Sequence, residues 1–328
     1  MKKLGIGVVG LGYIGQGHLR NSMKLADASL VAVSDISKKA LRSAMNAGVK
    51  KTYQSFEQLL KDPEIDCVVI AVPTHHHLQC AKEAAEAKKH IFLEKPIARN
   101  IEEAKEIISI TEKNSVKLMV GYPLRFNPAF RTLKEGIRSG TFGVVEIAYA
   151  TNISSGPFFH RAEGYVPTPV PEWWFNRELI GGGALLDLGS HMINLLRWYF
   201  GEVTNIRSHL SHRFNMDFED SAICLAKFEA GTKAVISVGW FSQDYKVEVE
   251  LYGTVKHATS RNAPSHPLST AIQMLTTGNS KFSWPQFAEL QYFINCLIRD
   301  KSPSPSGEDG LKDLEAISLA YKNEIHLD

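Results

Sequence analysis

The chain has 328 residues, of which 44% are hydrophobic and 22% charged, and both fractions are ordinary for a globular protein. That length predicts two domains or one large one, and the composition excludes long disorder and fibrous architectures. Lys and Arg number 37 against 35 Asp and Glu, and the resulting net charge of +2 argues against a dedicated binder of nucleic acid or another polyanion.

Cysteine usage and apolar patterning indicate where the protein works. The 4 cysteines are widely spaced, which fits neither a disulfide framework nor a zinc site but does fit a reducing cytosol. The N-terminus runs straight into a strand pattern that is too short and too rich in glycine for a signal peptide. No stretch approaches the length of a membrane-spanning run. We therefore expect a cytoplasmic protein without a nucleic-acid or membrane partner.

The first third of the chain alternates short apolar runs with helix-like segments. The runs lack polar alternation, which is typical of strands buried on both faces of a parallel sheet: Leu4–Val9, Leu30–Ser34, Cys67–Val72, Ile91–Leu93 and Val116–Val120. Helices are predicted between them, at about 13–26, 37–47, 55–61, 76–88 and 101–114. This alternation predicts right-handed crossovers and a doubly wound parallel sheet.

The alternation of buried strands and helices ends near residue 122. A helix is predicted at about 128–139 and a strand at about 144–153. An irregular stretch rich in proline and aromatic residues follows at 154–180, and a helical segment at about 183–199 ends at Gly201. Residues 123–328 therefore read as a second domain, distinct from a first domain of residues 1–122.

Period-2 patterns dominate the rest of the second domain. They predict strands at Val203–His212, Ser221–Phe228, Lys233–Phe241 and Lys246–Tyr252. A hairpin turn at Ala230-Gly231 indicates an antiparallel sheet with one open face, and so an α+β domain. Residues 256–285 read as irregular, and helices at about 285–299 and 308–323 end the chain. The last helix could pack back on the first domain.

Apolar residues on more than one face of the last two strands predict self-association. They are Val235, Ile236, Trp240, Val247, Val249 and Leu251. Left open, such a face would be an unusually large exposed apolar patch. We therefore expect a homodimer or homotetramer.

A glycine motif stands between the first strand and the first helix. Gly10-Leu11-Gly12-Tyr13-Ile14-Gly15 is a G-x-G-x-x-G in the context that a dinucleotide-binding turn requires. The three glycines allow a tight turn, close approach of a pyrophosphate and close helix–strand packing. The helix N-terminus would attract the phosphates.

An acid follows at the distance that this motif predicts. Asp35 ends the second strand, where its carboxylate could accept hydrogen bonds from the ribose hydroxyls and repel a 2′-phosphate. NAD is therefore the expected cofactor. NADP is the alternative, because Lys38 and Lys39 lie close in sequence. The simpler interpretation is a glycine-rich turn with an unrelated surface aspartate. The combination of strand, glycine turn, helix and acid disfavours it.

Two further clusters suggest catalysis. Glu94-Lys95-Pro96 ends the fourth strand, and the carboxyl ends of parallel strands form the ligand crevice, so Lys95 should point toward the cofactor. The Lys–Pro bond could be cis. A surface lysine at a turn explains the tripeptide alone equally well.

The second cluster is a polar stripe on an apolar helix. Asp187, His191 and Asn194 are spaced four and three apart and would share one helix face. Because buried polar groups need partners, the stripe should face a polar pocket. The competing explanation is a structural Asp–His hydrogen bond within the helix.

Together these residues resemble the glucose–fructose oxidoreductase/inositol dehydrogenase (Gfo/Idh/MocA) family over nearly the whole chain. The resemblance rests on the glycine motif with Asp35, on Pro73-Thr74-His75-His76-His77, on Glu94-Lys95-Pro96, on Gly121-Tyr122 with Arg125-Phe126-Asn127-Pro128, and on the helix carrying Asp187 and His191. It implies an α/β fold with an N-terminal Rossmann doubly wound parallel sheet. It also implies a C-terminal α+β domain with an open, mostly antiparallel sheet that commonly forms oligomer interfaces.

The resemblance also implies residue roles. Lys95, Asp187 and His191 match the catalytic positions of sugar and polyol dehydrogenases, and Asn194 stands where many members carry Asp. The expected cofactor-binding residues are Gly10, Gly12, Tyr13, Ile14, Gly15, Asp35, Ile36, Val72, Pro73, Thr74, His77, Glu94 and Lys95. The expected substrate-binding residues are Tyr122, Arg125, Trp174 and Asn194.

Two other features of the sequence have competing explanations. A metal at His75-His76-His77 is disfavoured because the run starts a helix with no carboxylate or cysteine nearby, so no metal site is expected. The aromatic loop at 154–180 could simply cap the second domain. It could equally line the pocket, because structureless loops of that length are usually functional.

The sequence thus predicts an NAD(P)-dependent dehydrogenase that transfers a hydride between nicotinamide and a secondary alcohol or ketone of a sugar, polyol or sugar derivative. One alternative is a nucleotide-sugar 3-dehydrogenase, in which Arg161 and Arg177 would meet a diphosphate. Another is a non-catalytic NAD-binding regulatory protein, because a fold does not fix a function.

Overall fold

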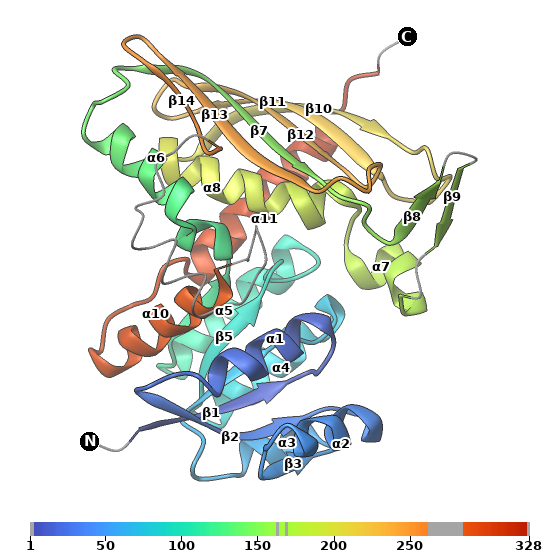
Figure 1. Ribbon diagram of the computed structural model, residues 1–328, viewed down its shortest axis with the longest axis vertical. Helices are drawn as coiled ribbons and strands as arrows, with labels where there is room; N and C mark the ends of the chain where they lie inside the picture. Colours follow the sequence, from blue (N-terminus) through green and yellow to red (C-terminus); the bar gives the residue numbers. More distant parts are fainter. Residues whose placement is uncertain (1–2, 162–163, 168–169, 262–284, 327–328) are drawn as a thin grey trace. The chain divides into compact units, whose positions relative to one another are not determined.

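The computed structural model describes residues 3–161, 164–167, 170–261 and 285–326, with no side-chain description at 160, 161 and 164–167. The chain divides into two compact units (Figure 1). The first comprises Met1–Pro123 and Pro285–Leu311, and the second comprises Leu124–Trp284 and Lys312–Asp328. The division into a cofactor domain at 1–122 and a substrate domain at 123–328 stays a prediction, because it concerns function as well as compactness.

The first unit is built on a six-stranded parallel sheet with the order β3-β2-β1-β4-β5-β6. Its strands are β1 (Leu4–Val9), β2 (Ala28–Ser34), β3 (Lys51–Tyr53), β4 (Cys67–Ile70), β5 (His90–Glu94) and β6 (Leu118–Gly121). The order reverses on either side of β1, and ligands of such sheets bind outside the carboxyl ends at this point. The predicted doubly wound sheet is confirmed. The sequence missed β3 because three half-exposed residues make no apolar run.

Five helices follow the strands of this unit in sequence. They are α1 (Tyr13–Ser22), α2 (Lys38–Asn46), α3 (Phe56–Leu60), α4 (His77–Glu86) and α5 (Ile101–Lys113). Three begin at side-chain caps, where Ser37, Ser55 and Asn100 accept a backbone N–H with the side-chain oxygen. A further helix, α10 (Gln286–Ile298), packs on α1 and contributes Phe293, whose ring lies 5.8 Å from that of Phe92.

The second unit contains a six-stranded mixed sheet with the order β10-β11-β12-β7-β13-β14. Its strands are β7 (Val145–Ile153), β10 (Val203–Ser211), β11 (Ser221–Phe228), β12 (Lys233–Gly239), β13 (Lys246–Gly253) and β14 (His257–Thr259). All pairs are antiparallel except β12 with β7. The expected open, mostly antiparallel sheet is confirmed, including the turn at Gly231, which has φ +87°.

Helices of the second unit include α6 (Pro128–Arg138) and α8 (Ser190–Phe200). The last helix, α11 (Gly307–Lys322), has residues in both units, since the first unit ends at Leu311. The irregular stretch predicted at 256–285 contains the short strand β14, while residues 262–284 lie outside the described residues.

One prediction about the second unit is wrong, and a second needs a local correction. The stretch 154–180 is not irregular throughout. It contains the hairpin β8 (Phe158–Arg161) and β9 (Gly164–Pro167), a 3-10 helix η3 (Glu172–Phe175) and a short helix α7 (Arg177–Ile180). Its strands are four residues long, too short for a clear period-2 signal.

The helical segment predicted at about 183–199 is present, but it is not α-helical throughout. It begins with a π-helical turn, η4 (Leu185–Gly189), before α8. Side chains of other segments form hydrogen bonds with the backbone of this turn. The Glu219 carboxylate accepts the N–H groups of Gly183 (3.1 Å) and Leu185 (2.9 Å), and the Asn152 amide donates to the Leu188 carbonyl (3.2 Å). These contacts satisfy backbone groups at the start and near the end of the π-helical turn.

Candidate active site

The glycine turn after β1 is built for close approach. Gly10 has φ +82°, and a Cβ there would lie 2.5 Å from the Ala71 carbonyl oxygen. A Cβ on Gly15 would lie 1.8 Å from the Gly10 carbonyl oxygen, so both positions need glycine for the fold itself. A Cβ on Gly12 would meet nothing within 4 Å. Glycine at that position leaves space that a side chain would fill, and this fits the close approach of a dinucleotide pyrophosphate.

Asp35 lies against that turn. Its Oδ2 accepts the Leu11 N–H at 2.6 Å, and its Oδ1 accepts the Ser37 N–H at 2.7 Å. These bonds fix the carboxylate at the carboxyl end of β2, and each oxygen keeps a further lone pair for a ligand hydroxyl. The predicted phosphate turn and the predicted ribose acid therefore form one connected unit.

Large apolar side chains next to this turn are exposed. Tyr13 and Ile36 are each 91% exposed, and Ile14 is also exposed. All three were predicted to contact the cofactor. Their exposure at the switch point of the sheet is consistent with a surface that a flat ligand would cover.

His77 connects two of the loops at the carboxyl edge of the sheet. Its Nε2 lies 3.0 Å from the Val72 carbonyl oxygen, and its Nδ1 lies 3.0 Å from that of Pro96. The ring is buried, and burial lowers the pKa of His77. It therefore fixes the Glu94-Lys95-Pro96 bend, where the Lys95–Pro96 bond is cis, to the segment Val72-Pro73-Thr74. A direct contact of His77 with cofactor stays a prediction.

Beneath Lys95 lies a buried cluster that sequence reasoning missed. His18 Nε2 lies 2.5 Å from Glu94 Oε1, and Glu94 Oε2 accepts the Lys95 N–H at 3.3 Å. Glu289 of α10 is fully buried, and burial, followed by the charge of Glu94, raises the pKa of this carboxyl well above its usual range. The missed signal was helical spacing, because Gly15, His18 and Ser22 share the buried face of α1.

In the second unit, the π turn carries Asp187. This carboxylate is half-buried, although its neighbours on the turn and in α8 are almost all buried. The Trp240 indole N–H donates to Asp187 Oδ2 at 3.3 Å. The Trp174 ring lies 6.2 Å from the Trp240 ring, so two of the predicted site residues, Asp187 and Trp174, adjoin the same side chain. His191 follows, buried on α8.

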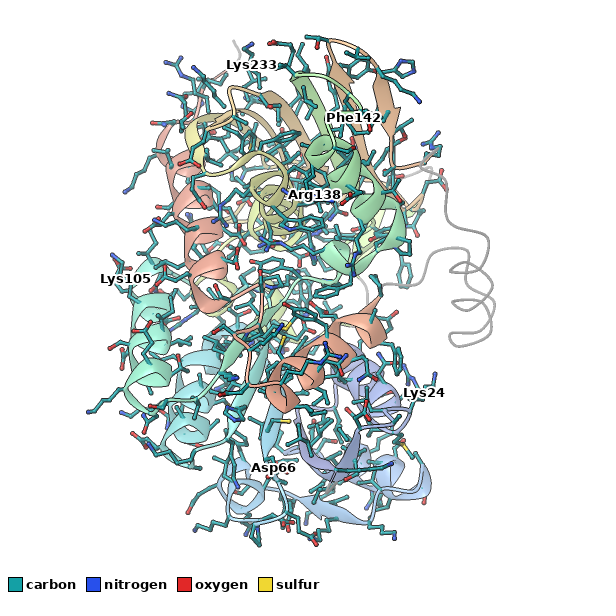
Figure 2. The ribbon with its side chains drawn as sticks, turned by 90° about the vertical axis from the view of Figure 1, so that its left-hand side faces the viewer. Lys24, Asp66, Lys105, Arg138, Phe142 and Lys233 are labelled. Carbon is teal, nitrogen blue, oxygen red and sulfur yellow. The ribbon has the colours of Figure 1, made fainter. Side chains whose placement is uncertain are left out.

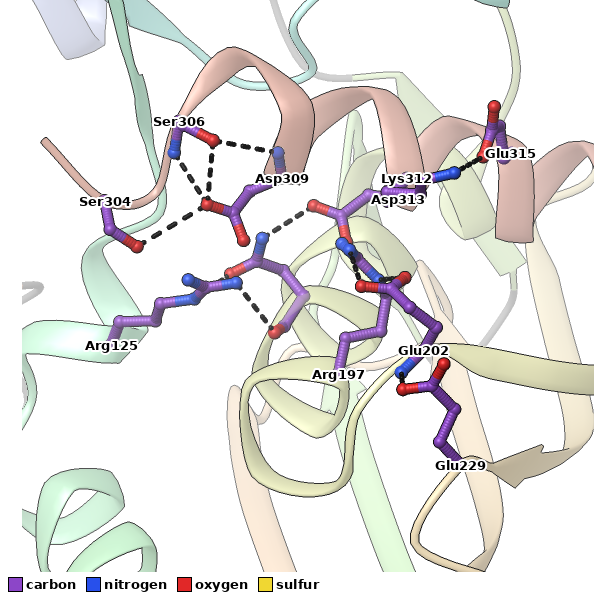
Figure 3. A network of polar contacts seen from close by, with 11 residues as sticks. Arg125, Arg197, Glu202, Glu229, Ser304, Ser306, Asp309, Lys312, Asp313 and Glu315 are labelled. Atoms are coloured by element: carbon purple, nitrogen blue, oxygen red, sulfur yellow. Dashed lines mark hydrogen bonds and ion pairs between the residues drawn. The ribbon is translucent and has the colours of Figure 1, made fainter. Parts of the chain in front are cut away.

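Asn194 and Arg125, predicted to bind substrate, take part in a buried network within the second unit. Figure 3 shows its charged members Arg125, Arg197 and Asp313. Asn194 Oδ1 accepts Arg125 Nε–H at 2.7 Å, and its Nδ2 donates to Asp313 Oδ2 at 2.6 Å. Arg197 joins Asp313 Oδ1 at 2.5 Å and Glu202 at 2.8 Å. Burial raises the pKa of Asp313 to about 6, against the opposing charge of Arg197. The amide of Asn194 thus anchors α8 to Arg125 and α11, and its contact with substrate stays a prediction.

The remaining predicted residues are placed as follows. Tyr122 is buried at the end of β6, in the first unit with Lys95, whereas Asp187, His191, Trp174, Arg125 and Asn194 belong to the second. Arg177, considered for a diphosphate, donates to the Asp217 carbonyl oxygen at 3.0 Å. The side chain of Arg161 lies outside the described residues.

Comparison with known proteins identifies the chain. The family model for the NAD-binding Rossmann fold of the GFO/IDH/MocA oxidoreductases matches residues 4–122, and the model for the GFO/IDH/MocA C-terminal domain matches residues 130–258. The chain belongs to the Gfo/Idh/MocA oxidoreductase family. The resemblance inferred from the sequence is therefore confirmed, as are an NAD-binding Rossmann domain and an oxidoreductase activity on alcohol groups.

Named relatives of this family span almost the whole chain. A myo-inositol 2-dehydrogenase of Thermotoga maritima is 28% identical, with 93% of this chain and 91% of the relative covered. An NAD⁺-dependent scyllo-inositol 2-dehydrogenase of Bacillus subtilis is 28% identical, with 97% and 93% covered. The crystal structure of a scyllo-inositol dehydrogenase from Lactobacillus casei, with bound NAD(H) and scyllo-inositol, superposes with a TM-score of 0.81 at 24% identity over 98% of this chain and 97% of that one. This likeness supports the fold.

The described residues were compared with the arrangements that metal sites and membrane-spanning helices require. Within the described ranges, no group of three or more His, Cys, Asp or Glu side chains is arranged to hold a metal ion. The same part of the chain contains one helical stretch, Arg177–Phe200, that is long and apolar enough to cross a membrane by length and composition, although 78% of its most apolar window is buried inside the structure. Such burial is typical of a core helix.

Proposed function

We propose that this chain oxidises a secondary alcohol of a sugar or polyol with NAD as the hydride acceptor, or reduces the corresponding ketone. The observation that carries the proposal is the connected unit of Gly12 and Asp35, joined through the bond from Leu11 N–H to the Asp35 carboxylate. It combines open space for a pyrophosphate with a fixed acceptor for ribose hydroxyls. Family membership and the inositol dehydrogenases among its relatives support an alcohol as the substrate.

The cofactor preference follows from the same carboxylate. A 2′-phosphate next to Asp35 would place like charges together in a site that is partly removed from water, which disfavours NADP. Backbone N–H groups at the start of α1 would receive the pyrophosphate, and Tyr13 and Ile36 would cover the adenosine. When bound, oxidised nicotinamide supplies the acceptor for the hydride that leaves the carbinol carbon.

The side chains supply proton transfer and orientation. In oxidation, the hydroxyl proton passes to His191 or Lys95 and the carbinol carbon becomes a ketone carbon. The Lys95 side chain polarises the oxygen as the carbonyl forms, and Asp187 orients His191 or holds a second hydroxyl. A positioned general base of this kind contributes roughly 10²- to 10⁴-fold to the rate.

A two-part assay tests the proposal. First, NADH and NADPH are titrated by fluorescence, and NADH is expected to bind more tightly. Second, a panel of inositols, pyranoses and hexitols is screened with NAD by absorbance at the reduced-nicotinamide band. NADH binding without turnover of any panel member would overturn the proposed reaction and favour a non-catalytic cofactor-binding protein.

A further inference from the structure

Three tryptophans of the second unit form a chain of ring contacts that ends at Asp187. Trp173 and Trp174 lie on η3, and their rings are stacked with centroids 5.6 Å apart. Trp174 meets Trp240, the residue after β12, at 6.2 Å and 62°. Trp240 in turn donates its indole N–H to Asp187. Segments distant in sequence thus place aromatic rings next to a carboxylate.

Trp240 is the fixed member of this group. It is 1% exposed, and the ring of Phe218 packs edge-on against it at 6.3 Å. The loop backbone at Gly156 approaches so closely that a Cβ there would lie 2.2 Å from the indole. Because packing and a hydrogen bond hold it, Trp240 is a rigid support for both Trp174 and Asp187.

Trp173 and Trp174 are half-buried, so parts of both indoles remain accessible. A partly exposed indole that is linked to a carboxylate through one buried ring has the chemistry that recognises a sugar ring. The C–H face of a pyranose or cyclitol is apolar and flat enough to stack on an aromatic face, while its hydroxyls donate to a carboxylate. An open-chain polyol has the same hydroxyls but no fixed C–H face, and it must lose more conformational entropy to present one.

We propose that Trp174, supported by Trp173 and Trp240, is a ring-stacking platform that makes this enzyme selective for cyclic polyols and sugars over open-chain polyols. The inference rests on the proposed function and narrows its substrate class. Trp174 contacts the carbon face of the ring, and Asp187 receives a hydroxyl at the edge of the same ring. Trp240 is a positioning residue, because it acts through these two neighbours.

The test compares cyclic and open-chain substrates of equal hydroxyl number. Wild type, Trp174→Leu and Trp174→Phe are assayed with NAD on the best inositol of the panel and on the hexitols. Trp174→Leu is expected to raise KM for the inositol about 10-fold and change kcat less than about 3-fold, because stacking stabilises bound substrate more than the hydride transfer. Trp174→Phe should restore most of the loss. Phe175→Leu, on the same 3-10 helix but packed on Phe158, serves as the matched control and should leave KM unchanged.

The outcomes separate this inference from the proposed function. Wild-type turnover of any panel member upholds the function. An unchanged inositol KM in Trp174→Leu, an equal KM increase for inositol and hexitol, or a wild type that prefers hexitols would then overturn the platform alone. A wild type that binds NADH but turns over nothing would overturn the function, and the platform with it. NADH affinity and circular dichroism, measured on each variant, show whether a loss arises from misfolding instead.

Discussion

The Trp240 indole nitrogen lies 3.3 Å from Asp187 Oδ2 and donates its proton to that oxygen. The donor directly follows β12 and the acceptor lies on a π-helical turn, so a residue at the end of a sheet strand fixes the carboxylate of a helical segment. This bond holds Asp187 Oδ2 in place and so fixes the orientation of the whole carboxylate. A functional carboxylate held in this way is oriented before substrate arrives.

We expect Trp240→Phe to lower kcat/KM about 5- to 10-fold. The substitution keeps an aromatic ring in the same packing but removes the hydrogen bond to a charged group. Because the bond is long, its free energy lies at the low end of the range for such bonds. A double-mutant cycle makes the test specific. In an Asp187→Asn background, Trp240→Phe should change kcat/KM less than about 2-fold, because the group it positions has already been altered. Equal effects in both backgrounds would mean that Trp240 acts on packing alone.

The fold and the cofactor site could be predicted because their signals are local. Buried parallel strands leave long apolar runs, and the glycine turn depends on spacing within six residues around Gly12. The Trp240–Asp187 bond could not be predicted, since it joins residues 53 apart in sequence that only the sheet brings together. The alternating pattern placed Trp240 among residues on an open face, whereas it is buried in the second unit.

The π turn η4 shows a second reason why part of the site could not be predicted from the sequence. An ideal α-helix would place Asp187, His191 and Asn194 on one stripe, but η4 changes the rotation between the first of these and the other two. The buried Glu219 carboxylate bonds this segment from outside, because it accepts the backbone N–H groups of Gly183 and Leu185 just before and at the first residue of the turn. No helical periodicity encodes a contact from a residue that lies beyond the helix.

Lys95→Ala should be the most damaging single change at the site. We expect kcat to fall roughly 10²- to 10⁴-fold, and less for His191→Ala, because Lys95 follows β5 at the sheet edge that carries the glycine turn. NADH affinity should stay within about 2-fold in both variants, since neither group is needed for adenosine or pyrophosphate. Fluorescence titration and initial rates on the panel's best substrate provide the two readouts. Near-parental kcat in Lys95→Ala would remove it from the catalytic assignment.

Asp35→Ala should weaken NAD binding more than NADP binding. The change removes an acceptor for ribose hydroxyls, which costs NAD affinity, and it removes repulsion of a 2′-phosphate, which favours NADP. The ratio of the two dissociation constants is expected to move at least about 10-fold toward NADP. Because Asp35 also accepts the Leu11 N–H, Asp35→Asn serves as the control that keeps an acceptor oxygen there. An unchanged ratio in Asp35→Ala would mean that another group reads the ribose.

The open face of the second sheet should mediate self-association, through a set of residues that shares Val235 with the set predicted from the sequence but differs from it in most other members. Ile236, Trp240, Val249 and Leu251 are buried within the unit, so they cannot form that surface. Leu225, Val235 and Tyr149 instead pair across β11, β12 and β7, and Leu225 is 54% exposed. We expect light scattering to give a dimer or tetramer at micromolar concentration. Leu225→Lys should shift it toward monomer because it buries a charge at the contact.

Val255→Lys is the control for that substitution, since Val255 is an exposed apolar residue in the turn after β13. It should leave the mass unchanged. A wild-type monomer, or the same mass change from both substitutions, would count against an interface on this face.

The buried carboxyl of Glu289 should make stability fall as pH rises. Burial, and then the charge of Glu94, raises the pKa of Glu289 in the folded chain. In the unfolded chain the pKa of a glutamate is about 4.3. Between these two values the unfolded state releases a proton that the folded state retains. The stabilisation from that proton is complete below the unfolded pKa and is lost as pH rises through the folded pKa, by up to about 1.4 kcal/mol per pH unit.

Glu289→Gln removes this dependence while keeping the shape of the protonated acid. From pH 5 to pH 8, the free energy of unfolding of the variant should therefore rise relative to that of wild type. Urea unfolding is followed by circular dichroism, because the described tryptophans all lie in the second unit and would not report on Glu289. The gain arises because wild type loses stability over this interval and the variant does not. Glu106→Gln, an exposed site on α5, is the matched control and should follow wild type at both pH values. If the difference between Glu289→Gln and wild type is the same at pH 5 and pH 8, Glu289 is ionised in the folded protein and its charge must be compensated within the His18–Glu94 cluster.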